Sequence, residues 1–434
     1  MCMSWDSLDR KDDREKIVMV LLEKYGFVTM RNNEIYVYQN GVYKRDIAKS
    51  LIRQFVEEVM GESGTRYDKN EVIDRIRCRT YKDWSFWNQP KNLICVANGV
   101  LDVDTLTLEP YSSEYHFLTK IPVWYIPKSE FEKLGCENRI DKFLREILPS
   151  EEDVEAMYEF FGYCLYRGMP IHKAFMLVGV GANGKSTLLS LLKAFLGKES
   201  IANISLQQLC QNRFAMAELH GKLANIFSDL TRKSLYETGM FKMLTGNDTI
   251  DAERKFVQKR VKLTNYAKLI FSCNMIPANE KDDTKAFWRR WILITFPNVF
   301  DKEHGNVDEK ILEKLTTKEE LSGLLLKALE GLKRLLKNGK FSNYRKVEYV
   351  RQDYIMKSNP VHAFTEKRLV TNIESFEEKS VVYRAYKQFC KEYSLPILDN
   401  NIFSRKLRTY IQFRDCQKTI SGKRGVWCYC GISL

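Results

Sequence analysis

The segment from Phe175 to Gly197, FMLVGVGANGKSTLLSLLKAFLG, has the residue types and spacing needed to bind phosphate. Within it, residues 179–186 read GVGANGKS and fit the pattern G-x-x-x-x-G-K-[ST]. The apolar run 174–178 predicts a buried strand before the loop, and STLLSLLKAFL after the lysine has helical spacing. A loop between a strand and a helix N-terminus directs backbone N–H groups at an anion, and glycines let the backbone wrap closely around it. The sequence therefore predicts a nucleoside triphosphate site.

Individual residues of this loop have distinct expected roles. Lys185 would neutralise the β- and γ-phosphates of ATP, and the Ser186 hydroxyl would coordinate Mg²⁺. The alternative is a glycine-rich turn with an incidental lysine, which the flanking strand and helix disfavour. The candidate nucleotide-binding residues are Gly179, Val180, Gly181, Ala182, Asn183, Gly184, Lys185, Ser186 and Thr187.

Further along the chain, polar residues lie at the ends of three apolar segments. Asp229 ends GKLANIFSDL, where a carboxylate at the edge of a sheet would suit a nucleotide-bound Mg²⁺. Asn274 ends KLIFSCN, where a side-chain amide would orient the attacking water. Arg289 and Arg290 precede the apolar strand in KAFWRRWILITF, and an arginine there would reach a γ-phosphate held by a neighbouring subunit. Each feature alone has a common structural explanation: a helix start, a turn residue or a surface pair beside buried tryptophans.

The order of these features resembles the ATPase core of the superfamily 3 helicases, a branch of the AAA+ ATPases. It most resembles the C-terminal helicase part of phage, plasmid and poxvirus primase–helicases, over about residues 173–300 and less specifically upstream and downstream. The resemblance implies that Lys185 and Ser186 are the phosphate-loop pair and that Asp229 belongs to the metal site. Such enzymes form rings, usually hexamers, and generally travel 3′ to 5′ on DNA.

The same resemblance assigns roles to the remaining candidates. It makes Asn274 the polar sensor and Arg290 the arginine finger acting in trans, with Arg289 as the second choice. The family usually has two adjacent acids before the metal site, but here the first position is Ser228. Which group activates the water therefore stays open. Because one subunit's arginine must complete the next subunit's site, the interface must be heterologous and closed into a ring.

DAERKFVQKRVK falls where the family carries a hairpin that projects into the central channel of the ring. The resemblance implies that Arg254, Lys255 and Lys259 meet phosphates there and that Phe256 presses on a sugar or base. The alternative is a solvated charged turn.

The C-terminal end is basic. Residues 400–434 carry seven basic residues against one acid, Asp415. SVVYRAYKQFCKEY and NIFSRKLRTYI predict two helices, and the rest predicts a hairpin that turns at residues 421–423, which together outline a winged helix. The candidate phosphate contacts are Arg405, Arg408, Lys423 and Arg424. A protein-docking module is the alternative.

Composition sets wider limits. The 434 residues predict two to four domains, and the net charge of +13 indicates a polyanionic partner or, alternatively, a soluble surface. No apolar run is long enough for a membrane span and no signal peptide is evident, so we expect a soluble, intracellular (cytoplasmic) protein. Eleven scattered cysteines indicate free thiols and no structural metal, with a local arrangement of Cys416, Cys428 and Cys430 as the alternative.

We thus expect an α/β protein with a phosphate-loop AAA+ core, an N-terminal α+β and helical module, and a C-terminal winged-helix-like domain. The expected divisions are an α+β module at 1–138, a collar-like helical linker at 139–172, the ATPase core at 173–300, a helical segment at 301–359 and a basic domain at 360–434.

The leading hypothesis is an ATP- and Mg²⁺-dependent replicative DNA helicase of a virus, phage or plasmid. It would act as a homo-oligomeric ring on single-stranded and forked DNA, with a primase or polymerase as a further partner. An origin-recognition protein or ATP-switched DNA clamp is the first rival, favoured by Ser228 in place of an acid. A small-molecule kinase is the second, disfavoured by the arginine pair and the basic end. The N-terminal 130 residues show no paired carboxylates beside a histidine, so primase activity is not expected.

Overall fold

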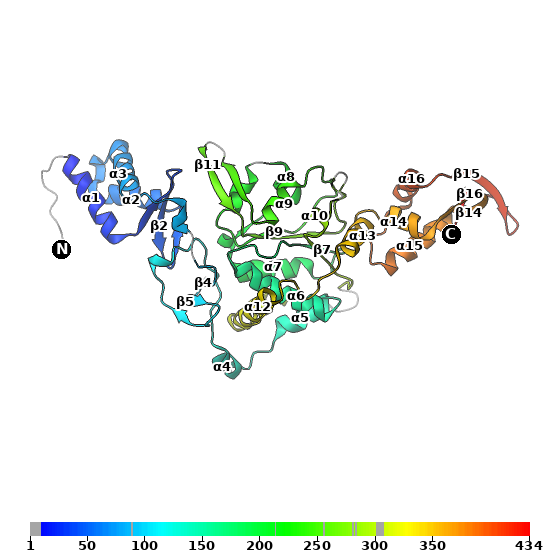
Figure 1. Cartoon of the computed structure of the whole chain (residues 1–434), viewed down its shortest axis with the longest axis horizontal. Coiled ribbons are helices and arrows are strands. Elements are labelled where there is room, and N and C mark those ends of the chain that lie inside the picture. Colours follow the sequence, from blue (N-terminus) through cyan, green and yellow to red (C-terminus); the bar gives the residue numbers. More distant parts are fainter. Residues whose placement is uncertain are drawn as a thin grey trace.

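The computed structural model describes residues 10–87, 90–212, 214–254, 257–279, 282, 284–300 and 308–434. Figure 1 shows a mixed α/β chain in which a central body lies between an N-terminal unit and a C-terminal unit. Among the described helices, none is both long and apolar enough to cross a bilayer.

The central body is built on a parallel sheet, as the sequence predicted. Its strand order is β13–β7–β12–β9–β8, and every neighbouring pair is parallel. All residues of β7 and β12 are buried, which is typical of parallel strands that are covered on both faces. The strand bounds are β7 (Ala174–Val178), β8 (Ile201–Ala202), β9 (Ala224–Phe227), β12 (Lys268–Cys273) and β13 (Trp291–Thr295).

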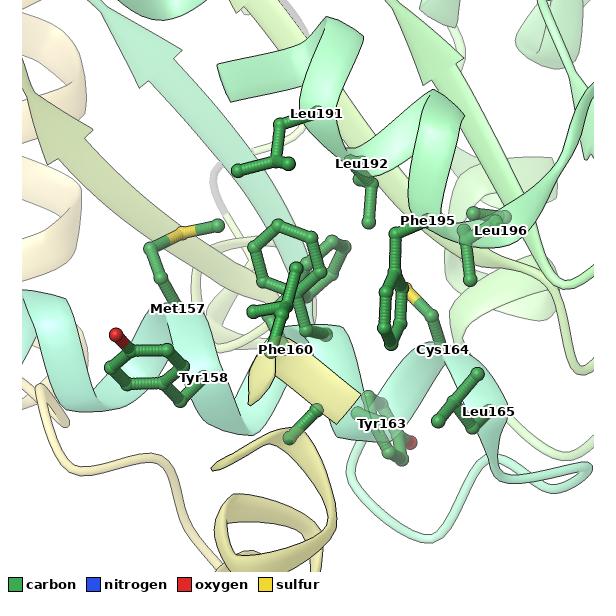
Figure 2. Close-up of a cluster of buried hydrophobic side chains, with 14 of the residues drawn as sticks. Met157, Tyr158, Phe160, Tyr163, Cys164, Leu165, Leu191, Leu192, Phe195 and Leu196 are labelled. Carbon is green, nitrogen blue, oxygen red and sulfur yellow. The ribbon is translucent and has the colours of Figure 1, made fainter. Parts of the chain in front are cut away.

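Helices cover both faces of this sheet, because alternate residues of each strand point to opposite sides. Phe175 and Leu177 of β7 join one buried cluster, and Met176 and Val178 join the other. Figure 2 shows the first cluster, where aromatic and aliphatic side chains of two helices interleave beneath the sheet. The first face carries α5 (Arg139–Ile147), α6 (Glu151–Leu165), α7 (Lys185–Leu196), α11 (Ile311–Leu315) and α12 (Lys318–Asn338). The second carries α8 (Leu206–Gln211), α9 (Gly239–Thr245), α10 (Lys285–Trp288) and α13 (Val347–Ser358).

Helices α6 and α12 cross with their backbones in close contact. A Cβ atom on Gly162 would lie 2.0 Å from the carbonyl oxygen of Ala328, and one on Gly331 would lie 2.9 Å from the backbone nitrogen of Glu159. The fully buried Glu159 carboxylate beside this crossing accepts hydrogen bonds from Arg334 Nε at 2.7 Å and from the Ser342 backbone nitrogen at 2.8 Å. Residues 139–172 and 318–338 therefore pack as one layer under the sheet.

The N-terminal unit contains two small antiparallel sheets and three helices. The β2–β3 hairpin turns at Asn40 and Gly41, both with positive φ, which is typical of an Asn-Gly turn. Helix α3, which the sequence analysis did not predict, packs against α1. The elements are α1 (Arg10–Lys24), β1 (Phe27–Thr29), β2 (Ile35–Gln39), β3 (Val42–Lys44), α2 (Ala48–Met60), α3 (Arg66–Arg79), β4 (Leu93–Val96), β5 (Gly99–Asp102) and β6 (Leu108–Glu109), followed by the short α4 (Lys128–Phe131).

The C-terminal unit combines three helices with a three-stranded antiparallel sheet of order β14–β16–β15. Its own buried cluster includes Phe364, Tyr386 and Phe403. A disulfide joins Cys416 to Cys430 across the sheet, so the expectation of free thiols is wrong for this pair. The elements are α14 (Pro360–Arg368), β14 (Val370–Glu378), α15 (Lys379–Glu392), α16 (Asn400–Tyr410), β15 (Arg414–Ile420) and β16 (Lys423–Ser433).

The close approach of α6 and α12 predicts a large effect for a single methyl group. Gly162→Ala should lower the free energy of unfolding by about 1–3 kcal/mol, because the new Cβ would overlap the Ala328 carbonyl. Urea unfolding followed by tryptophan fluorescence measures this change. Gly239→Ala is the matched control, since nothing lies within 4 Å of its Cβ position. Equal stabilities of the two variants would contradict the tight crossing.

Candidate functional site

The loop from Gly179 to Gly184 joins β7 to the N-terminus of α7, as the sequence predicted. Its shape depends on glycine at two positions. A Cβ on Gly179 would lie 2.2 Å from Asn183 Nδ2, and Gly184 has a φ of +83° with Ile147 Cγ2 2.6 Å from its Cβ position. Ala182 also has a positive φ, of 57°. The loop therefore curls tightly and leaves Val180 and Gly181 at the open surface.

Lys185 is the first residue of α7, and its ammonium group lies within the loop. Its Nζ donates to the Gly179 carbonyl at 2.6 Å and to Asn183 Oδ1 at 2.7 Å. Burial lowers the pKa of Lys185 to about 8, while Cys273 and Asp229 oppose that shift. Asp229 is therefore close enough to Lys185 for their charges to interact.

Asp229 and Asn274 lie at the same sheet edge as the phosphate loop. Asp229 follows β9, Asn274 follows β12, and the loop follows β7. These three strands are parallel neighbours in the order β7–β12–β9, so their carboxyl ends meet. Both side chains are exposed, as is Ser228. The structure thus brings the predicted loop, acid and amide together at one exposed edge.

Arg289 and Arg290 lie at the opposite edge of the sheet, where the amino ends of the parallel strands meet. They precede β13, which runs parallel to β7 with Trp291 opposite Ala174. A five-residue strand is about 17 Å long. This length separates both arginines from the phosphate loop of their own chain.

The two arginines differ sharply in their surroundings. Arg290 is buried, and its guanidinium donates to Thr245 Oγ1 at 2.9 Å, to the Lys242 carbonyl at 3.1 Å and to the Ala286 carbonyl. Arg289 is exposed, and its carbonyl accepts from Lys173 Nζ at 2.6 Å. The exposed guanidinium is the one that another molecule can reach.

The segment predicted to form a hairpin does so, through β10 (Thr249–Arg254) and β11 (Val257–Thr264). Arg254 and Lys259 lie on its two strands, and their side-chain positions fall outside the described residues. Lys255 and Phe256, which follow β10 in the sequence, also lie outside the described residues. Their expected contacts with DNA remain predictions.

The candidate DNA contacts of the C-terminal unit lie on two elements. Arg405 and Arg408 are exposed on α16, and Arg408 pairs with Asp415. Lys423 and Arg424 are exposed at the start of β16. The two arginines on the helix and the two basic residues at the tip of the hairpin therefore lie on separate elements.

A groove of about 510 Å³ in the same unit adds basic residues that the sequence analysis missed. Lys379, Arg384 and Lys387 of α15 line it together with Trp427 of β16. The spacing of these three residues along one helix was the feature of the sequence that could have identified them as a basic surface. The contribution of Trp427 depends on the folding of the sheet and had no signal in the local sequence.

Three regions of the chain match family models. Residues 16–149 match a model described as D5 N terminal like, residues 177–290 match a family of unknown function, DUF5906, and residues 356–422 match a model described as poxvirus D5 protein-like. A putative helicase of Acanthamoeba polyphaga mimivirus is 28% identical over 346 residues, a match covering 68% of this chain and 35% of the relative. The chain thus spans about a third of the length of this curated relative.

Among solved structures, two apo structures of the NrS-1 C terminal region are similar to this chain at 15% identity. They have TM-scores of 0.47 and 0.48 and cover 97% of this chain and 100% or 99% of their own.

The resemblance to primase–helicases that the motifs indicate is therefore confirmed: parts of this chain are similar to D5-type family models and to a putative viral helicase. The two D5 models match the N-terminal and C-terminal units, and the mimivirus relative adds a viral helicase-like homologue.

The residues at the edge of the sheet that carries the phosphate loop are suited to bind a nucleotide together with Mg²⁺. A Cβ atom at Gly179 or Gly184 would clash with its surroundings, so glycine at these positions lets the loop take the tight curl that suits a phosphate. The Ser186 hydroxyl and the Asp229 carboxylate are the oxygen donors that Mg²⁺ prefers. These two side chains would hold the ion, which would neutralise phosphate charge when bound.

The lowered pKa of Lys185 predicts that nucleotide affinity depends on pH. A bound triphosphate favours the ammonium form, so binding takes up a proton once the pH exceeds about 8. Affinity for ATP should be level below pH 8 and then fall by up to about tenfold per pH unit. Calorimetry in buffers of different ionisation enthalpy measures both the affinity and the proton uptake.

Lys185→Arg is the control for this measurement, since its guanidinium stays charged and its affinity should not show this fall. A wild-type affinity that stays level up to pH 9.5, without proton uptake, would contradict the assignment.

Proposed function

We propose that this protein is an ATP-dependent DNA helicase that acts as a ring, with each ATP site shared between two subunits. The observation that carries the proposal is the placement of charge on the sheet. The phosphate loop, Asp229 and Asn274 lie at one edge, and the exposed Arg289 lies at the other. An arginine that cannot reach its own site, in a relative of viral helicases, supports catalysis across a subunit interface.

The arrangement supports a AAA+ type of core. The phosphate loop follows an inner strand of a five-stranded parallel sheet, and the two polar residues follow its next two neighbours. In this core the loop N–H groups and Lys185 bind the phosphates. Ser186 and Asp229 hold the metal, and Asn274 orients the attacking water. With Ser228 in place of a second acid, Asp229 is the one acid of this pair that can polarise the water.

The burial of Arg290 reverses the order in which the two arginines are preferred as the arginine finger. Arg290 donates three hydrogen bonds within its own chain, so moving it to a neighbour's phosphate would break all three, to Thr245 Oγ1 and to two partly buried carbonyls. Moving the exposed Arg289 guanidinium would break no comparable set of hydrogen bonds with the described residues. We therefore assign the arginine finger to Arg289 and a structural role to Arg290.

The hairpin β10–β11 and the C-terminal unit supply the proposed DNA contacts. In the C-terminal unit, the order of helix, strand, two helices and hairpin supports a winged helix. Arg405 and Arg408 lie on α16, the second of the two consecutive helices, and Lys423 and Arg424 lie in the hairpin that would form the wing. A hexameric ring and 3′ to 5′ movement follow from the family resemblance. Single-stranded and forked DNA are the proposed substrates, with a primase or polymerase as a further partner.

An ATP-switched DNA clamp is the second candidate, and the exposed Ser228 is the observation that favours it. A missing acid beside Asp229 would slow hydrolysis and favour binding over unwinding. A clamp would show ATPase activity stimulated by single strands but no strand displacement.

Displacement of a labelled strand from a 3′-tailed fork tests the proposed function. The wild-type protein should release the strand only with ATP and Mg²⁺. Lys185→Ala should abolish ATP turnover and unwinding while leaving single-strand binding largely intact, because the loop lies at a different edge of the sheet from the hairpin base. Loss of binding together with turnover would contradict this division, and stimulated turnover without displacement would identify the clamp.

Mixing experiments test the shared site. Arg289→Ala subunits added to wild type should lower ATPase activity by more than their fraction, because each mutant subunit disables its neighbour's site. An activity that falls only in proportion to the mutant fraction would remove the role in trans.

Arg290→Ala is the matched control for the mixing experiment. It should lower the free energy of unfolding by about 1–3 kcal/mol, since it removes a buried hydrogen bond to Thr245 and a partly buried one to the Lys242 carbonyl. Strong poisoning by Arg290→Ala, together with inert Arg289→Ala, would restore the original assignment.

A further inference from the structure

A cavity of about 490 Å³ lies at the amino edge of the parallel sheet, opposite the phosphate loop. Its walls come from the N-terminal unit, from the segments that lead into β7, β9 and β12, and from the base of the β10–β11 hairpin. The residues that matter here are Trp84, Lys91, His116, Arg167, His220 and Tyr266. The proposed mechanism of ATP hydrolysis uses none of them.

Among the described residues, the charged side chains that line this cavity are all basic. Lys91 and Arg167 line it with two histidines, and among the described residues its lining includes no aspartate or glutamate. Arg167 is held in place, because it donates to the Leu93 carbonyl at 3.2 Å and lies over the Phe117 ring at 4.1 Å. Cations on the wall of a concave surface without nearby carboxylates attract an anion.

The position of Lys91 is also defined by packing. A Cβ on Gly168 would lie 3.3 Å from Lys91 Cδ, so the aliphatic stem of the lysine lies along the backbone of residue 168. The lysine itself is exposed. Its ammonium group is therefore carried at the rim of the cavity, next to the buried stem of Arg167.

Aromatic rings face the same space. The Trp84 and His220 rings meet edge to face with centroids 5.6 Å apart, one from each side of the boundary between the N-terminal unit and the central body. Tyr266 lies two residues before the buried start of β12. Rings for stacking and cations for phosphate are the two components that proteins use to bind single-stranded nucleic acid without reading its sequence.

We propose that this cavity binds a nucleotide of single-stranded DNA, with Lys91 and Arg167 on a backbone phosphate and the Trp84–His220 pair against a base. The inference rests on the proposed function and extends it by placing a DNA contact between the N-terminal unit and the hairpin base. DNA is favoured over a free nucleotide because the cavity adjoins the hairpin and the chain already has a separate triphosphate site at the opposite edge.

The salt dependence of DNA binding tests the phosphate contact. Fluorescence anisotropy with a labelled oligothymidylate gives the affinity at several salt concentrations, in the presence of a non-hydrolysable ATP analogue. Lys91→Gln should reduce the slope of log affinity against log salt by about 0.7, the value for one lost phosphate contact to a single strand. Lys49→Gln, an exposed lysine of α2, is the matched control and should leave the slope unchanged.

A second variant tests the base contact. Trp84→Ala should weaken binding about 5- to 150-fold with no change in slope, because stacking carries no counterion release. Trp124→Ala, an exposed tryptophan outside the cavity, is its control. Oligonucleotides carrying 5-iodouracil should also crosslink to Trp84 or Tyr266, as located by mass spectrometry.

The outcomes separate this inference from the proposed function. If wild-type protein neither binds single strands nor gains ATPase activity from them, the proposed function fails. If it does both, but Lys91→Gln and Trp84→Ala leave affinity and slope unchanged and crosslinks fall elsewhere, the cavity inference alone is overturned. Labelled ATP that binds Lys185→Ala protein and is released by Trp84→Ala would also overturn it, in favour of a free nucleotide.

Discussion

Parallel strand pairing is the constraint on which the rest of this structure depends. Because β7, β12 and β9 run in the same direction, their carboxyl ends place the phosphate loop, Asp229 and Asn274 at one edge. The same rule places Arg289, which precedes β13, at the other edge. In the proposed mechanism these two sets of groups act in one reaction, and a neighbouring subunit would bring them together. The proposed ring follows from this separation and from the family resemblance.

Local sequence predicted the features that depend on a few consecutive residues. The phosphate loop, with the strand before it and the helix after it, was expected because glycine spacing and apolar runs encode these features directly. The order of preference between Arg289 and Arg290 was not accessible in this way. The two residues are adjacent, and only the carbonyls presented by α9 and α10 decide which of them is buried.

Other features were missed because their signals lie outside the local sequence. Helix α3 is largely charged and has only three buried apolar residues, and β14 is mostly exposed and polar. The cavity takes its residues from several separated segments, so no single stretch of sequence identifies it. The pairing of Cys416 with Cys430 likewise appears only when β15 and β16 are aligned.

Strand β12 carries a consequence for how the two edges are linked. At its start, the fully buried Lys268 donates to the carbonyls of Gly168 and Tyr266, both at 2.8 Å, on either side of the cavity wall. At its far end lies Asn274. Six residues of unbroken strand make a strut about 20 Å long between them. In the proposed mechanism, β12 would thus connect Asn274 at the nucleotide site to the part of the cavity wall formed by Arg167 and Tyr266, with no loop in between.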